Sequence, residues 1–101
     1  MVKTFGIWEI NSSGINCKIG SGYTYRIDKK TLWDTIDRDG FTLNVWPIHL
    51  SDNSWMTDKI LDDLFDALEF AQQYFLKNNT KTKDFSWGQT KAYAKENLNR
   101  N

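Results

Sequence analysis

Apolar and polar residues alternate in short runs along the first half of the chain, a pattern that predicts β-strands. These runs cover residues 4–10, 15–19, 23–27 and 41–46. The first three are separated by short segments rich in Asn, Ser and Gly, which favour tight turns. Because parallel neighbours need a long crossover, we expect an antiparallel meander of three strands. The fourth run ends at Pro47, which has no N–H for a sheet ladder.

The second half of the chain changes to the period of an α-helix. Over residues 57–77 the apolar side chains recur on one side at about 100° per residue. Ser86 and Gln89 match a capping box at the start of a second helix, over 87–98, whose apolar stripe is weak. Asp28 is suited to cap a short helical segment that ends near residue 36.

The predicted fold class is therefore α+β. We expect the meander, a short helical crossover, a fourth strand, then a long amphipathic helix and a C-terminal helix packed on one sheet face. Residues 1–101 are expected to form a single domain, with the last few residues frayed.

Composition limits the class of protein. Aromatic residues make up 15% of the chain, so the core is expected to be built on rings. No run approaches the length of a membrane span, and the first residues lack the pattern of a signal peptide, so the sequence predicts a cytoplasmic protein. The single Cys17 alternates with apolar neighbours and is interpreted as a buried hydrophobe rather than a reactive thiol.

Charge is balanced overall but unevenly distributed. The net charge is zero, yet residues 51–76 carry six acidic and one basic side chain. On the long helix, Asp58, Asp62, Asp66 and Glu69 share one face, opposite the apolar face. Phe65 and Phe70 flank this acidic face, so two interpretations stay open: a solvated face, or a surface for a partner protein with a basic, partly apolar groove.

The segment between the fourth run and the long helix is crowded with unusual residues. Trp46, His49, Asp52 and Trp55 lie within ten positions. The favoured interpretation is a structural corner, and the alternative is a polar lip over an aromatic floor that binds a partner. One His with one nearby Asp does not supply enough ligands for a metal site, and His49 lacks an evident nucleophile, so no enzyme activity, metal or cofactor is expected.

Residues 77–101 are basic, with six basic and two acidic side chains. Lysines interleaved with aromatic rings are typical of surfaces that bind single-stranded nucleic acid. Candidate residues for such a surface are Lys81, Lys83, Trp87, Lys91 and Lys95, with Arg26 on the outer sheet face. The basic segment is also able to fold back on the acidic helix, in the same chain or in a second copy.

The sequence thus favours a small, non-catalytic protein-binding module, such as an inhibitor, an immunity protein or an anti-defence protein of a phage or mobile element. It would bind a larger host or phage protein through the acidic helix face and the Trp-rich corner. The alternative is a nucleic-acid-binding protein that uses the basic C-terminal quarter and the outer sheet face. Self-association is a further option.

Overall fold

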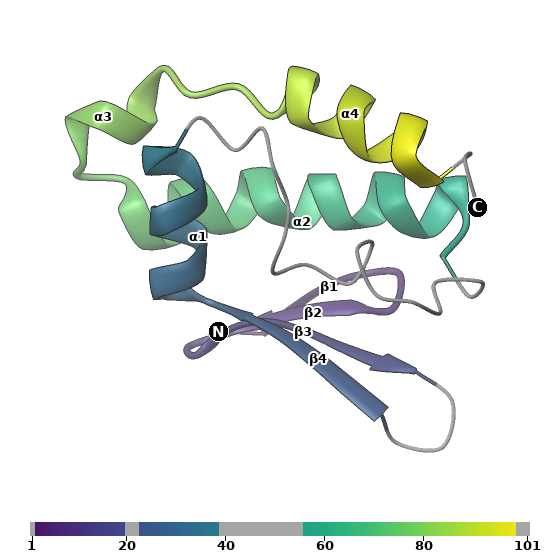
Figure 1. Cartoon of the computed structure of the whole chain (residues 1–101). Coiled ribbons are helices and arrows are strands. Elements are labelled where there is room, and N and C mark those ends of the chain that lie inside the picture. Colours follow the sequence, from purple (N-terminus) through teal and green to yellow (C-terminus); the bar gives the residue numbers. More distant parts are fainter. Residues whose placement is uncertain (1, 20–22, 39–55, 99–101) are drawn as a thin grey trace.

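The computed structural model describes residues 2–19, 23–38 and 56–98, which form one antiparallel sheet and a layer of helices (Figure 1). The strands are β1 (Lys3–Phe5), β2 (Trp8–Asn11), β3 (Gly14–Ile19) and β4 (Tyr23–Asp28), in the spatial order β1-β2-β3-β4. The helices are α1 (Lys29–Asp37), α2 (Asp58–Leu76), α3 (Thr80–Lys83) and α4 (Gly88–Leu98). The α+β class is confirmed.

The first apolar run is not one strand but two. Gly6 adopts a φ of 61° and begins a two-residue loop, after which Trp8 pairs back against Phe5. Only glycine adopts such a backbone conformation without strain, so this residue decides where the hairpin turns. The flanking apolar residues conceal the turn in the sequence. All four described strands thus come from the first 28 residues, and the predicted strand over 41–46 lies outside the described residues.

The next hairpin follows the expected turn chemistry. The Asn11 side-chain oxygen accepts hydrogen bonds from the backbone N–H of Ser13 at 2.9 Å and from its hydroxyl at 2.7 Å. Asn11 then pairs with Gly14, which begins β3 at a φ of 139°. The side-chain bonds replace part of the ladder within the turn, which is why Asn is favoured here.

The helix boundaries agree closely with the prediction. Asp28 accepts a hydrogen bond from the Thr31 N–H at 2.8 Å, so it caps α1 as expected. The Thr57 hydroxyl accepts from the Ile60 N–H at 3.2 Å and caps α2. At the start of α4 the Ser86 hydroxyl accepts from the Gly88 N–H at 3.3 Å, one residue earlier than a capping box requires.

Helix α2 is the centre of the structure. One side of α2 packs on β1, β2 and β3 of the sheet (Figure 1). The helix also contacts the other three helices, α1, α3 and α4. The C-terminal helix therefore rests on α2, with α2 between it and the sheet, as Figure 1 shows. The Trp8 indole N–H donates to the Ile60 carbonyl at 2.9 Å and joins the sheet to the start of α2.

The core fills the space between the sheet and α2. Ile15 and Cys17 of β3 face it, as their alternation predicts, and both are buried. Burial raises the pKa of the Cys17 thiol to about 11, because the thiolate loses hydration in this environment. Cys17 is thus a protonated core residue at neutral pH, in agreement with its interpretation as a small hydrophobe.

Candidate functional site

The acidic face of α2 is partly neutralised by the chain itself. Asp62 pairs with Lys95 at 2.7 Å and with Lys91 at 3.2 Å, both from α4. Asp63 pairs with Lys59, one turn earlier in α2, at 2.6 Å. The basic segment therefore folds back on the acidic helix within one chain, one of the two arrangements that the sequence left open.

The ion pairs between α2 and α4 shift the pKa values of their partners. Hydrogen bonds from Lys95 and then Lys91 lower the pKa of the Asp62 carboxyl below its ordinary value. The same contact raises the pKa of the Lys95 ammonium. Both partners are partly exposed, so the pairs orient α4 on α2 and add little stability in salt.

Three acidic side chains of this face stay exposed. Asp58, Asp66 and Glu69 have no ion-pair partner among the described residues. Asp58 begins α2, whereas Asp66 and Glu69 lie on consecutive turns in its second half. The unpaired charge of the predicted acidic face therefore lies at both ends of the Asp62 contact with α4.

The two phenylalanines predicted to edge the acidic face do not both reach the surface. Phe65 is only 2% exposed and packs edge-on against Trp87, with ring centroids 6.1 Å apart. Phe65 is therefore a core residue, and its assignment to the partner surface is wrong. Phe70 is half-buried and lies 5.9 Å from the ring of Phe5 and 6.1 Å from that of Tyr74.

The candidate nucleic-acid residues are dispersed rather than gathered. Trp87 is 2% exposed, so its ring is not available for stacking on a base, and that assignment is also wrong. Lys91 and Lys95 point to Asp62. Arg26 is exposed on β4 of the sheet, with its guanidinium 3.5 Å from the Ser13 carbonyl oxygen.

For several predicted site residues, the position of the side chain is not described. Trp46, His49, Asp52 and Trp55 lie outside the described residues. Lys81 and Lys83 belong to α3, but only their backbone is described. Their roles stay predictions.

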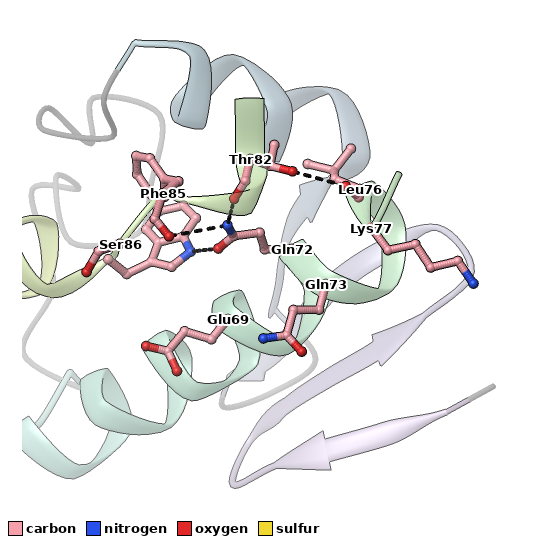
Figure 2. A pocket seen from close by; sticks show the side chains of 9 residues that line it. Glu69, Gln72, Gln73, Leu76, Lys77, Thr82, Phe85 and Ser86 are labelled. Carbon is pink, nitrogen blue, oxygen red and sulfur yellow. Dashed lines mark hydrogen bonds between the residues drawn. The ribbon is translucent and has the colours of Figure 1, made fainter. Parts of the chain in front are cut away.

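A pocket that the sequence did not reveal opens beside Glu69. It has a volume of about 600 Å³ and lies between the C-terminal half of α2, the short helix α3 and the segment that leads to α4 (Figure 2). Glu69, Gln73 and Lys77 of α2 form one side, while Phe85 and Ser86 form the other. Gln72 and Trp87 lie at its floor.

The floor of the pocket is held by the side-chain amide of Gln72. Its oxygen accepts a hydrogen bond from the Trp87 indole N–H at 2.7 Å, and its nitrogen donates to the carbonyls of Thr82 and Phe85 (Figure 2). One side chain of α2 thereby fixes α3, the following segment and the start of α4. Buried polar groups need such partners, so this network specifies how the pocket closes.

The sequence held only a weak signal for Gln72. The helical period places residue 72 between Leu61 and Phe65 around the helix axis, at the border between the apolar and acidic faces of α2. A glutamine at that border is buried only where another element packs against it, and it then requires hydrogen-bond partners. Which groups provide them depends on how residues 80–87 fold back, and this is not encoded in the local pattern.

The pocket carries one charge at each end. Glu69 and Lys77 lie eight residues apart on α2, which corresponds to about 12 Å along the helix (Figure 2). The ring of Phe85 lies on the opposite wall, 4.8 Å from that of Trp87. This arrangement suits a ligand with an extended apolar part and a positive group near Glu69.

Among the described residues, no three His, Cys, Asp or Glu side chains come together in a way that would hold a metal ion. Nor is any described helix long and apolar enough to cross a membrane. Comparison with protein-family models, with curated proteins and with solved structures found no match, so the functional argument rests on the residues themselves.

Proposed function

We propose that this chain is a non-catalytic protein-binding module that takes up a basic segment of a larger protein at the pocket beside Glu69. The observation that carries the proposal is the position of the unpaired carboxylates. On α2, Asp62 and Asp63 are matched by lysines of the same chain, whereas Asp58, Asp66 and Glu69 are exposed, and of these three Asp58 lies far from the pocket. Glu69 lines the pocket and Asp66 precedes it by one turn.

The pocket fits the side chain of a lysine or arginine from a partner. The aliphatic stem would lie along the ring of Phe85, and the charged head would reach Glu69. A partner carboxylate about 12 Å away would meet Lys77 at the other end. Binding would thus require a basic and an acidic group at a set separation, which gives specificity as well as attraction.

The ion pairs within the chain also support a preference of the acidic face for a basic segment. Lys91 and Lys95 stand one helical turn apart on α4 and converge on Asp62. The acidic face of α2 already binds a basic segment in this way within the chain. A small module of this kind would act by occupying a surface of its partner, as inhibitors and immunity proteins do.

The test compares two charge-reversal variants in affinity capture from the native host. Asp66→Lys together with Glu69→Lys should abolish capture of the partner, while Asp58→Lys serves as the matched control. Asp58 lies on the same helix and is also exposed, but it is more than two turns from the pocket. Each capture is repeated after nuclease treatment, and the folding of each variant is checked by thermal unfolding.

A partner that binds the wild type and the Asp58 variant but not the double variant supports the proposal. NMR supplies a direct reading, because the Trp87 indole N–H lies at the pocket floor. Its resonance should shift when a peptide segment of that partner, containing lysine or arginine, is added. Equal capture by all three proteins would refute the proposal, and loss of the partner with nuclease would favour nucleic acid.

A further inference from the structure

A second surface, formed by aromatic rings and lysines, lies near the C-terminal end of α2. Phe70 and Tyr74 stack one turn apart, with ring centroids 6.1 Å apart and planes only 15° from parallel. Phe75 meets Tyr74 edge-on at 5.0 Å, and Phe5 of β1 lies 5.9 Å from Phe70. Tyr74 is 41% exposed even though it contacts the rings of both Phe70 and Phe75.

Lysines stand at both ends of this row of rings. The Lys3 ammonium lies 5.0 Å from the centre of the Phe70 ring and 5.6 Å from that of Phe5. At the other end the Lys29 ammonium lies 5.1 Å from the centre of the Phe75 ring. The rings thus separate two cations that come from β1 and α1, two elements that both pack on α2.

The segment between Glu69 and Asp84 is basic. From Phe70 to Lys83 the chain carries Lys77, Lys81 and Lys83 and no Asp or Glu. Beside Tyr74 the surface is hollowed into a shallow depression of about 340 Å³, lined among others by Phe75, Lys77 and Asn78. The depression therefore joins an exposed ring, a cation and an amide able to hydrogen-bond a base edge.

From this combination we infer that the row of rings around Tyr74 binds single-stranded nucleic acid. A base stacks on the exposed ring of Tyr74, which Phe70 supports from its other side, while Lys3, Lys29 and Lys77 contact the phosphates. Stacking on rings is tolerant of base identity, so binding is expected to show little sequence preference. The surface shares Leu76 and Lys77 with the pocket beside Glu69, but its aromatic rings do not line that pocket, and the inference does not depend on the proposed protein partner.

The experiment is fluorescence anisotropy of labelled oligothymidylate and oligouridylate, each about eight nucleotides long, with the full chain at low salt. Tyr74→Ala should weaken binding about five-fold or more, since a stacked base is lost. Tyr74→Phe retains the ring and should bind like the wild type. Lys3→Ala and Lys29→Ala should each lower the slope of log affinity against log salt by about 0.7.

Two controls separate this surface from others. Lys59→Ala removes a lysine that pairs with Asp63 on α2, and it should leave oligonucleotide binding unchanged. The Asp66 and Glu69 reversals should not weaken binding either, so the two proposals fail independently. Thermal unfolding confirms that the Tyr74 variants fold.

A duplex of the same length serves as the comparison for single-strand preference. Three results would overturn the inference. One is the absence of binding to either oligonucleotide at low salt. The others are equal affinity of the Ala and Phe variants at position 74, and equal affinity for a duplex of the same length.

Discussion

Replacing Gln72 with leucine removes the one side chain that connects α2 to the whole wall of the pocket. The amide accepts from the Trp87 indole N–H and donates to the Thr82 and Phe85 carbonyls, at a site where Gln72 itself is only 8% exposed. Leucine has nearly the same size, so the variant tests hydrogen bonding rather than volume. The Trp87 N–H and the Thr82 carbonyl would be left buried without their partner.

Each buried polar group left without a partner costs about 1–3 kcal/mol, and the added apolar surface of leucine returns about 1 kcal/mol. We therefore expect Gln72→Leu to lower the free energy of unfolding by about 2–4 kcal/mol. Gln73→Leu is the matched control, since Gln73 is exposed on the pocket rim and its replacement should stay within about 0.5 kcal/mol.

Urea unfolding followed by tryptophan fluorescence measures both variants, with circular dichroism as a second probe of two-state behaviour. Gln72→Glu adds a pH test. Its carboxylate accepts from Trp87 but has no proton for the Thr82 carbonyl, and burial raises its folded pKa above the unfolded value of about 4.3. The Gln72→Glu variant should therefore lose stability as pH rises from the unfolded pKa of the new carboxyl to its raised folded pKa. Equal losses for the leucine variants at positions 72 and 73 would refute the reasoning.

Three further predictions follow from the turn, the core thiol and the helix contact. Gly14→Ala should cost at least about 2 kcal/mol in urea unfolding, because Gly14 has a φ of 139° and an added Cβ would lie 2.3 Å from the Ile27 carbonyl oxygen. The thiol of Cys17 should resist alkylation in the folded protein. Burial raises the pKa of Cys17 from 9.0 to about 11, so its contribution to the free energy of unfolding should be complete below pH 9. That contribution should fall by up to about 3 kcal/mol as pH rises to 11, a loss absent in Cys17→Ala. The protection of α4 amides against hydrogen exchange, expressed relative to the intrinsic exchange rate at each pH, should fall in high salt and as pH falls through the lowered pKa of Asp62. Asp62→Asn should remove both effects.

The local pattern of the sequence determined which elements form and which side of each is buried. The alternation of Ile15 and Cys17 assigned them to one strand face, and the 100° period of 57–77 located α2 to within a residue at each end. Asp28 marked the start of α1 in the sequence, because a capping carboxylate accepts hydrogen bonds from N–H groups only a few residues away. These interactions are short in sequence, so a reading of the sequence recovers them.

The tertiary structure decided what each charged or aromatic side chain meets. The sequence left open whether Phe65 and Trp87 lie at the surface, and the packing of α4 and its preceding segment on α2 buries both. Asp62 carries the same charge as Asp66, but only Asp62 lies within reach of the α4 lysines.

The pocket and the row of rings have the same origin. Gln72 meets residues ten to fifteen positions away, and Lys3 meets Phe70 across most of the chain. Partners at such separations are selected by the packing of whole elements, and that packing depends on the shape of the core rather than on a local period.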